Sequence, residues 1–205
     1  MKKVIIVDYG CGNIASVVRS FGRQKCSVCC SSNPSDILSA DRIILPGVGQ
    51  FAIGMKALEQ LNLLDALCEF VTIKKKPILG ICLGMQLMTK RSEEGDVDGL
   101  GWFDAETIKF RVEDKQRFKI PHIGWNTIQQ NRSHTILNNV TEDSFFYFVH
   151  SYHVECVNQA DSLGVTDYAY SFSSIIQKEN IIGVQFHPEK SYEAGDMMFE
   201  NFLKM

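Results

Sequence analysis

The sequence has no long hydrophobic run, no surplus of positive charge and few prolines. No apolar stretch approaches the roughly 20 residues that a membrane-spanning helix needs, so we expect no association with a membrane. The 205 residues include 21 Lys and Arg against 24 Asp and Glu, for a net charge of −3. Because the basic residues are scattered, no nucleic-acid surface is predicted. With five prolines and no linker, repeat or low-complexity stretch, residues 1–205 are expected to form one domain.

Cysteine occurs in an odd number, and no secretion signal accompanies it. The apolar run after Lys2 and Lys3 is interrupted at Asp8, before the roughly 7–15 residues that a signal-peptide core needs. We therefore expect the seven cysteines to be reduced thiols of a cytoplasmic protein. Cys26 and Cys29 have the spacing of a metal or redox motif, but no second ligand pair follows them, so buried thiols are the favoured interpretation.

Two other patterns suggest cofactors but are incomplete. The turn Gly10-Cys11-Gly12 lacks the third glycine of a dinucleotide-binding loop. The carboxylates between residues 93 and 98 lack the register of a calcium loop. The sequence therefore predicts neither a metal nor another cofactor.

The first half of the chain alternates between strand-like and helix-like segments, which predicts parallel strands with right-handed crossovers. The second half contains short extended runs separated by turns, which predicts antiparallel hairpins laid against the first sheet. The expected fold is α/β: a mixed, mostly parallel central sheet flanked by helices, with an antiparallel portion in the second half. Strands are expected at 4–8, 27–31, 42–45, 77–81, 107–112, 127–129, 145–149, 153–157, 174–177 and 182–186, and helices at 13–21, 52–71, 83–89 and 192–203.

Cys82 lies between Gly80 and Gly84, where a buried strand is expected to meet a helix. This is the nucleophile-elbow pattern with cysteine in the serine position. On such a sharp turn, side chains two residues away would collide with neighbouring backbone, so glycine is needed there. The helix N-terminus favours a thiolate, and adjacent backbone N–H groups, including that of Leu83, can stabilise an oxyanion. The alternative is an inert cysteine of the core.

A thiolate needs a proton carrier, and His187 with Glu189 fits that role. Residues at i and i+2 of an extended chain point to the same side, so Glu189 can approach the His187 ring. A zinc-deaminase interpretation of His-x-Glu requires a downstream Pro-Cys-x-x-Cys, and no cysteine follows Glu189. The remaining four histidines are weaker candidates, because we expect none of them to be paired so closely with a carboxylate: His122, His134, His150 and His153.

Taken together, these and further stretches resemble class I (triad-type) glutamine amidotransferases, and within them the glutaminase subunits of imidazole glycerol phosphate synthase. They occur in the expected order from residue 8 to residue 190, so the resemblance covers essentially the whole chain. The stretches are Asp8-Tyr-Gly-Cys-Gly-Asn13, Leu45-Pro-Gly-Val-Gly49, Gly80-Ile-Cys-Leu-Gly-Met-Gln86, Pro121-His-Ile-Gly-Trp-Asn126, Tyr147-Phe-Val-His-Ser-Tyr152 and Gly183-Val-Gln-Phe-His-Pro-Glu-Lys190.

The resemblance implies a role for each matching position. Cys82, His187 and Glu189 match the catalytic triad. The loop Gly47-Val48-Gly49 matches the oxyanion strand, which in the family is thought to reorient when the partner's substrate binds. The residues that match the binding site for the amino-acid end of glutamine are Gln86, Glu94, His150 and Ser151. Those that match positions near the synthase interface or the ammonia path are Asn13, Trp125, Tyr147 and Lys190.

The resemblance also implies a reaction and a partner. Glutamine would be hydrolysed to glutamate and ammonia, and a (β/α)₈-barrel cyclase would use the ammonia in histidine biosynthesis. The chain departs from the family at residues 102–106 and in the charged stretch 111–119. This leaves open a paralogous acceptor, such as a surface-polysaccharide sugar that becomes amidated. A stand-alone cysteine hydrolase or peptidase, and a binding subunit without catalysis, also stay open.

Overall fold

The structure is a computed structural model that describes residues 2–22, 24 and 26–205. Its centre is a row of five parallel strands in the order β2-β1-β3-β4-β14, formed by Ser27–Ser31, Lys3–Val7, Arg42–Gly47, Ile78–Cys82 and Ile181–Val184. Nearly every residue of β1 and all residues of β3, β4 and β14 are buried. Such unbroken apolar runs are typical of parallel strands covered on both faces.

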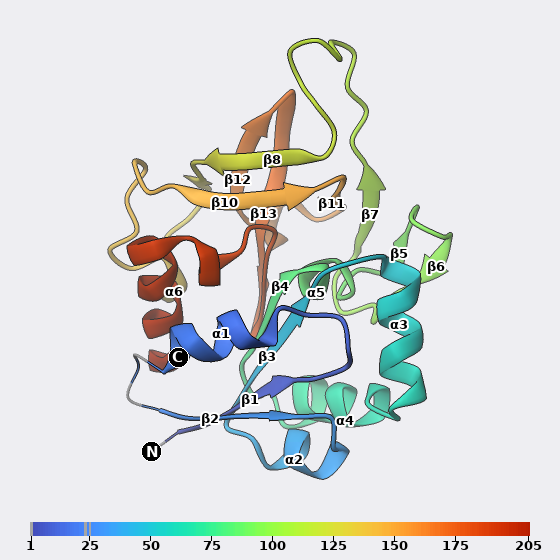
Figure 1. The fold of residues 1–205 in the computed structure, drawn as a ribbon, viewed down its shortest axis with the longest axis vertical. Helices are drawn as coiled ribbons and strands as arrows, with labels where there is room; N and C mark the ends of the chain where they lie inside the picture. The colour runs from blue at the N-terminus through green and yellow to red at the C-terminus, as the bar shows by residue number, and fades with distance from the viewer. Residues whose placement is uncertain (1, 23, 25) are drawn as a thin grey trace.

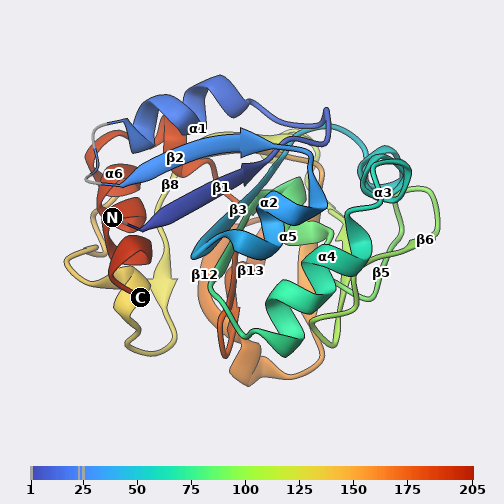
Figure 2. The ribbon, with the colours of Figure 1, turned by 90° about the horizontal axis from the view of Figure 1, so that it is seen from below.

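Helices cover both faces of these strands (Figures 1 and 2). On one face α1 (Ile14–Phe21) and α6 (Tyr192–Lys204) pack Phe21, Phe199 and Phe202 into a core with the alternate side chains of β1, β3 and β4. On the other face lie α2 (Pro34–Ser39), α3 (Phe51–Gln60) and α4 (Leu64–Cys68), which continues into a π-helical turn, η1 (Glu69–Ile73). The expected α/β fold is confirmed.

The strands of the second half mostly extend this sheet. Strand β13 (Tyr170–Lys178) pairs antiparallel with β14, and the sheet continues through β11 (Tyr152–Cys156), β7 (Ala105–Lys109), β5 (Arg91–Ser92) and β6 (Val97–Asp98). Strands β12 (Ser162–Tyr168) and β9 (Gln129–Gln130) branch from β13. The prediction of hairpins laid against the first sheet was therefore wrong for these strands. Strand β14 pairs with β4 on one side and with β13 on the other, so the parallel strands continue directly into the antiparallel ones.

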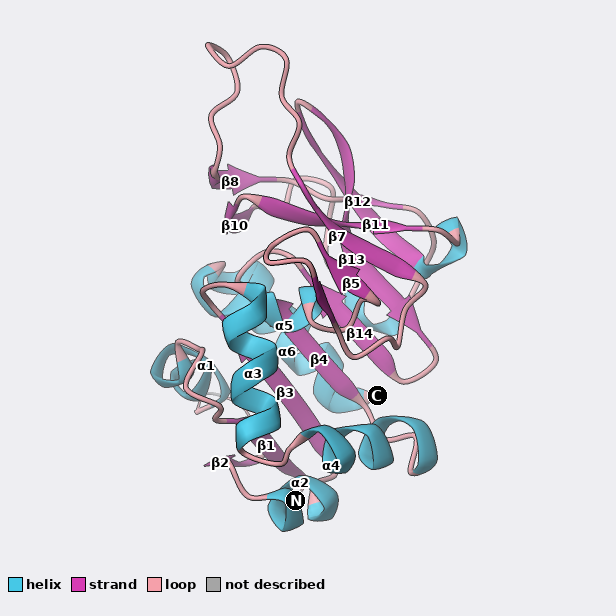
Figure 3. Ribbon diagram, turned by 90° about the vertical axis from the view of Figure 1, so that its right-hand side faces the viewer, coloured by secondary structure: helices cyan, strands magenta, loops and turns pink. Residues whose placement is uncertain are grey.

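A separate two-stranded ribbon forms beside this sheet from β8 (His122–Asn126) and β10 (Phe146–His150). Figure 3 shows it next to the upper strands, below the long loop of residues 110–121 that joins β7 to β8. The predicted strand at 127–129 overlaps β9 only at Gln129, and β8, which pairs with β10, was not predicted. Strand β12 was missed, and its hairpin with β13 is irregular near Gly164.

Two predicted helices are shorter than expected. The segment 52–71 is interrupted after α3, where Asn62 adopts a left-handed conformation with φ 55° and Leu63 N–H donates to the Leu58 carbonyl at 3.0 Å. Asparagine tolerates this conformation better than most residues, so the chain turns and begins α4. Helix α5 covers only Leu83–Gln86, not 83–89. Among the described residues, no helix has the length and hydropathy needed to cross a bilayer.

Candidate active site

Cys82 is the last residue of β4 and immediately precedes α5. Its backbone has φ 53° and ψ −109°, a strained region for a residue other than glycine. Strand β3 ends beside it, with Gly47 paired to Cys82. The carboxyl ends of two parallel strands thus bring the thiol next to the loop that begins at Gly47.

The glycines on either side of Cys82 are required by close backbone approach. A Cβ atom on Gly84 would lie 1.8 Å from the Leu45 carbonyl oxygen, and one on Gly80 would lie 2.7 Å from the Gly84 carbonyl oxygen. Both distances are far below van der Waals contact. The steric reason predicted for the two glycines is confirmed, and the close packing of α5 on β3 holds the turn in its strained form.

His187 follows β14 and precedes the 3₁₀ turn η4 (Pro188–Lys190), which carries Glu189. The Nδ1 atom of His187 lies 2.7 Å from Glu189 Oε1, and the two side chains are 1% and 2% exposed. The His187 backbone is fixed by a bond from its N–H to the Tyr147 carbonyl at 2.9 Å. The Ser191 hydroxyl also donates to the His187 carbonyl, at 2.6 Å. The predicted approach of Glu189 to the His187 ring is confirmed.

The electrostatics of the site favour a charged imidazole. Burial alone would lower the pKa of His187, but the adjacent Cys82 sulfur and then Glu189 raise it to about 10. The buried Nε2 atom makes no hydrogen bond within the described part of the chain, so it is available to a reacting group. At neutral pH the ring is therefore an imidazolium, and a cation beside a cysteine favours the thiolate.

The four remaining histidines differ from His187 in this respect. Burial lowers the pKa of His122 and of His153 to about 4, and lowers that of His150 well below its ordinary value. The pKa of His134 is also lowered, by burial and by Arg132. None of these rings is a charged partner for Cys82 at neutral pH, in keeping with the prediction that they are weaker candidates.

The loop Gly47-Val48-Gly49 borders the thiol, but one of its N–H groups is already engaged. Val48 N–H donates to the Cys11 carbonyl at 3.1 Å. Gly49 has φ 108°, a conformation that favours glycine. Gly47 has no room for a side chain, since a Cβ would lie 2.6 Å from the Tyr9 hydroxyl. In this conformation, Val48 does not offer its N–H to an oxyanion.

A cavity of about 410 Å³ opens above Cys82, a size that suits a small molecule. Most of the residues predicted for the site meet on its wall, whereas Gly47 and Glu189 lie behind it. Three wall residues were missed, although all of them adjoin or lie within the stretches that carried the resemblance. The wall is formed by Val48, Gly49, Cys82, Leu83, Gln86, Glu94, Pro121, Val149, His150, Ser151, Tyr152 and His187.

Hydrogen bonds to neighbouring groups fix two polar side chains of this wall, those of Gln86 and Glu94. Gln86 is 5% exposed, and its Nε2 donates to the Tyr152 carbonyl at 3.0 Å and to Gln185 Oε1 at 3.1 Å. The Glu94 carboxylate accepts a bond from Phe51 N–H at 2.8 Å, at the N-terminus of α3. These bonds engage the amide nitrogen of Gln86 and leave its side-chain Oε1, and Glu94 supplies a carboxylate; both are acceptors that suit an ammonium group.

Three of the four residues predicted near a partner lie together on the outer face of the β8–β10 ribbon. Trp125 and Tyr147 are cross-strand neighbours with ring centroids 5.7 Å apart, and Lys190 Nζ lies 5.3 Å from the centre of the Tyr147 ring. Asn13 lies at the start of α1, where its side chain accepts a bond from Ser16 N–H at 3.4 Å.

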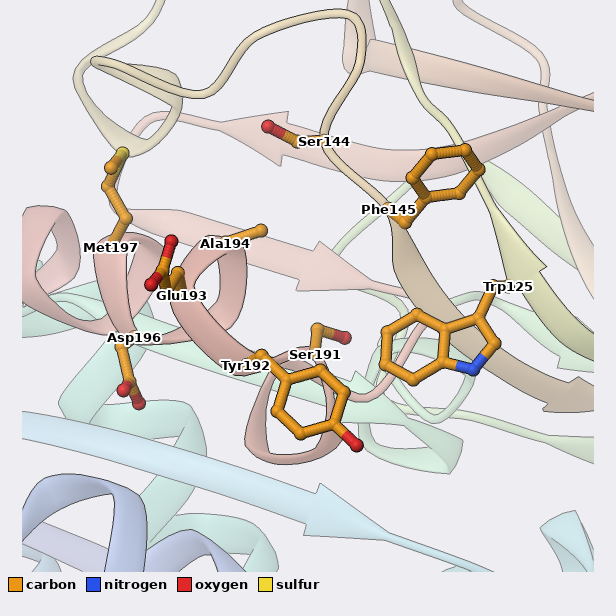
Figure 4. Close-up of a pocket in the computed structure, with 9 residues that line it drawn as sticks. All are labelled: Trp125, Ser144, Phe145, Ser191, Tyr192, Glu193, Ala194, Asp196 and Met197. Carbon is orange, nitrogen blue, oxygen red and sulfur yellow. The ribbon is translucent and has the colours of Figure 1, made fainter.

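A larger hollow of about 800 Å³ lies beyond Trp125, between the ribbon and the start of α6. Figure 4 shows the Trp125 and Tyr192 rings on one side of it and Phe145 above them. The two rings are stacked, with centroids 5.3 Å apart and planes at 6°, while Tyr192 and Phe145 are 76% and 55% exposed. Sequence reasoning missed this hollow because its aromatic residues are far apart in the chain.

The described residues include no cluster of three or more His, Cys, Asp or Glu side chains that could hold a metal ion.

The fold and the site together define an α/β protein with a cysteine nucleophile elbow and a His–Glu pair beside the sulfur. The family model of class-I glutamine amidotransferases matches residues 5–205, and the chain belongs to that family. Solved structures share the fold. They include PurLQS from Thermotoga maritima (TM-score 0.75, 16% identity, 100% of this chain and 99% of that chain). Another is the Trypanosoma brucei CTPS glutaminase domain with bound acivicin (TM-score 0.67, 17% identity, 99% and 92%).

Curated relatives are more similar in sequence. One from Methanococcus maripaludis, named imidazole glycerol phosphate synthase subunit HisH 2, is 45% identical over 201 residues, covering 98% of each chain. A Pseudomonas aeruginosa protein of the same name is 42% identical over 98% of this chain and 99% of its own length. M. maripaludis also has a relative named subunit HisH 1, which is 40% identical over 98% of this chain and 99% of its own.

Proposed function

We propose that this chain hydrolyses glutamine to glutamate and ammonia, with Cys82 as nucleophile, His187 as acid and base, and Glu189 orienting His187. One observation carries the proposal: a buried imidazolium lies between a carboxylate and a cysteine on the wall of an amino-acid-sized cavity. The names of the relatives and the family support glutamine as the substrate. Glu94 and the Gln86 carbonyl oxygen suit its α-ammonium group.

The reaction follows from these positions. The thiolate attacks the carboxamide carbon, and a tetrahedral oxyanion forms. His187 donates its Nε2 proton to the departing nitrogen, and ammonia leaves a γ-glutamyl thioester on Cys82. His187, now neutral, then takes a proton from water as that water attacks the thioester, and glutamate is released. Glu189 holds Nδ1 protonated throughout, so that Nε2 always faces the reacting atoms.

We propose that the loop 47–49 has to turn before catalysis is fast. An oxyanion needs donors within hydrogen-bond reach, and loss of one donor typically costs about 2.7–4 kcal/mol of barrier. The bond from Val48 N–H to the Cys11 carbonyl withholds one such donor. If this bond is released when a partner docks, the Val48 N–H becomes available to the oxyanion. Ammonia is then made only when a partner is present to use it.

We further propose that the ammonia passes to a (β/α)₈-barrel cyclase subunit that docks on the outer face of the β8–β10 ribbon. Val149, on that ribbon, lines the cavity above Cys82. The exposed Ile123 is paired with Val149 across the ribbon, and the exposed Trp125 lies farther along the same face. The docking face therefore runs directly to the cavity. The names of the relatives favour imidazole glycerol phosphate, and hence histidine biosynthesis, as the destination of the ammonia.

A second destination is favoured by one specific observation. Within M. maripaludis, the chain is more similar to the subunit named HisH 2 than to the one named HisH 1. An organism with two such subunits needs only one for a single pathway. The second proposal is therefore a paralogous subunit whose ammonia amidates a different acceptor, such as a polysaccharide sugar. Purification of the native complex identifies the partner and decides between the two.

The experiment for the catalytic proposal uses the complex with its purified partner. Cys82→Ala should abolish glutamine-dependent product while leaving product formation from added ammonia intact. Cys156→Ala is the control, because Cys156 is also buried but lies on β11, away from the cavity wall, and should retain both activities. Glutamine hydrolysis that persists in Cys82→Ala would contradict the proposal.

A further inference from the structure

A buried chain of hydrogen bonds runs from the backbone of the cavity wall to the sulfur of Cys82. The Tyr152 carbonyl accepts from Gln86 Nε2 at 3.0 Å, and Gln86 Nε2 also donates to Gln185 Oε1 at 3.1 Å. The Nε2 atom of Gln185 then lies 3.7 Å from Cys82 Sγ. Gln185 is fully buried, yet neither the triad nor the substrate contacts proposed above include it.

The direction of each bond in this chain is determined by its first member. A carbonyl oxygen can only accept, so the nitrogen of Gln86 must be the end that faces Tyr152. The second hydrogen of that nitrogen meets Gln185, which must therefore turn its oxygen towards Gln86. The amide of Gln185 is left with its NH₂ group towards the sulfur. The end of the chain at Cys82 is consequently a donor.

The Tyr152 carbonyl is itself fixed from a second side. His150 Nδ1 lies 2.8 Å from it, and His122 Nδ1 lies 3.1 Å from His150 Nε2. Because burial keeps His150 neutral by lowering its pKa, its proton must be on Nδ1, and Nε2 accepts a hydrogen bond from His122. His150 thus fixes the position of the Tyr152 carbonyl, and His122 fixes His150. The Tyr152 carbonyl in turn orients the amide of Gln86, and through it the amide of Gln185.

The backbone around Gln185 also points its side chain at the thiol. Gln185 directly follows β14, and its N–H donates to the Ser174 carbonyl at 2.9 Å. In the bend after β14, Phe186 packs on Phe146 with centroids 4.2 Å apart. Its two neighbours in the chain, Gln185 and His187, are the residues that approach the sulfur.

We infer that Gln185 is a catalytic residue, whose side-chain N–H binds the Cys82 thiolate and holds it for attack on the carboxamide carbon. The inference rests on the proposed function, because it names a further group of the same site. A donor to an anionic sulfur is a charge-assisted hydrogen bond. It stabilises the thiolate at the start of the cycle and again when hydrolysis of the thioester releases it. It also links the nucleophile to Gln86, on the wall that binds substrate.

The experiment measures the rate at which the Cys82 thiol is alkylated. Gln185→Met keeps a similar unbranched side chain without a donor, and Gln185→Glu keeps the shape but replaces N–H with oxygen. Each variant is treated with iodoacetamide at pH 6, and alkylation of Cys82 is followed by mass spectrometry of its peptide. Alkylation should slow on the order of tenfold, because less thiolate is present. At strongly alkaline pH the rate should equal or exceed that of the unaltered protein, since a less stabilised thiolate is the better nucleophile.

Gln177→Met is the matched control. Gln177 is also a largely buried glutamine with side-chain hydrogen bonds, but it lies on β13 with Glu179 and Arg132 as its partners. It should alkylate like the unaltered protein at both pH values. If Gln185 served only in packing, its replacement would lower stability. It would not slow alkylation at pH 6 while leaving the rate at alkaline pH equal or higher. Unchanged alkylation at pH 6 in a folded Gln185 variant overturns the inference.

A second measurement needs no Gln185 variant. In protein labelled with ¹⁵N-glutamine, alkylation of Cys82 should shift the side-chain amide resonance of Gln185 and leave that of Gln177 in place. An unshifted Gln185 resonance overturns the inference even if both Gln185 variants fail to fold. Neither readout depends on turnover, whereas the proposed function fails if the unaltered complex does not hydrolyse glutamine. The two failures are therefore distinguishable.

Discussion

The His187 ring is where the chemistry of this protein is concentrated at the scale of single residues. It is almost fully buried, which should keep an imidazole neutral, yet the pKa is raised to about 10 because Cys82 and Glu189 lie on either side of it. A charged ring in such a place is stable only with its neighbours present. The contribution of Glu189 to the charged ring can therefore be measured in the free energy of unfolding.

Glu189→Gln tests this effect through pH. The folded-state pKa of His187, about 10, lies above its unfolded value of about 6.5. The stability that comes from protonated His187 is therefore fully present below about pH 6.5 and is lost as the pH rises towards 10. The free energy of unfolding should be higher in the unaltered protein than in Glu189→Gln. This difference should be largest below pH 6.5 and should shrink towards pH 10. Urea titrations measure it, and a difference independent of pH contradicts the assignment.

Gly84 gives a second prediction at this scale. Gly84→Ala places a Cβ 1.8 Å from the Leu45 carbonyl oxygen, so α5 must move away from β3. Overpacking of this kind typically costs about 1–3 kcal/mol, and here it should also displace Cys82 and lower turnover at least tenfold. Gly22→Ala is the control, because its Cβ would make ordinary contacts at 3.4 Å. Thermal unfolding together with glutamine hydrolysis checks both; equal stability of the two variants would contradict the packing argument.

At the scale of helices and strands, the sequence predicted what depends on local pattern. The apolar runs of β1, β3 and β4 and the helical period of α1 and α6 were placed within one or two residues. The Gly80–Gly84 spacing located the thiol because the steric need for glycine is local. What failed depends on partners distant in the chain: the insertion of β14 beside β4, and the pairing of β8 with β10.

The same limit applies to the site. The proximity of Glu189 to the His187 ring could be predicted because the two residues are close in the chain, and Cys82 has its own local signature. The bond between Val48 and Cys11, and that between Gln185 and Cys82, join segments whose proximity exists only in the folded sheet. No periodicity or spacing in the sequence could have indicated them.

The break between α3 and α4 is the clearest local signal that was overlooked. Asn62 has φ 55°, so Asn62→Gly should leave the free energy of unfolding nearly unchanged or slightly higher. Asn62→Val should lower it by about 1–3 kcal/mol, since a β-branched residue is strained in that conformation. Denaturant titration measures both variants. Equal stability of the two would mean that the turn is not limited by backbone conformation.

At the scale of the whole molecule, the cavity over Cys82 and the aromatic face of the β8–β10 ribbon adjoin each other. A glutaminase that makes ammonia for another protein needs this arrangement, because ammonia released to water is protonated and lost. The exposed Trp125, Tyr192 and Phe145 are side chains of the kind that dominate binding energy at interfaces. They extend the predicted partner surface of Trp125, Tyr147 and Lys190 towards α6.

Trp125→Ala should therefore weaken binding of the purified partner at least tenfold, a loss expected of a central aromatic residue. Ile73→Ala is the control: Ile73 is 76% exposed but precedes β4, at the opposite end of that strand from Cys82. Isothermal titration calorimetry measures both, with circular dichroism to verify folding. If the two variants bind alike, the partner docks elsewhere.

The central claim is that the sulfur of Cys82 attacks the carboxamide of glutamine and forms a covalent intermediate. The most direct measurement is acid quenching of the chain during turnover of glutamine with its partner, followed by peptide mapping. We predict a γ-glutamyl thioester on the Cys82 peptide, and none on the corresponding peptide of Cys82→Ala. Glutamate formation with no modified Cys82, or with the glutamyl group on another residue, would contradict this mechanism.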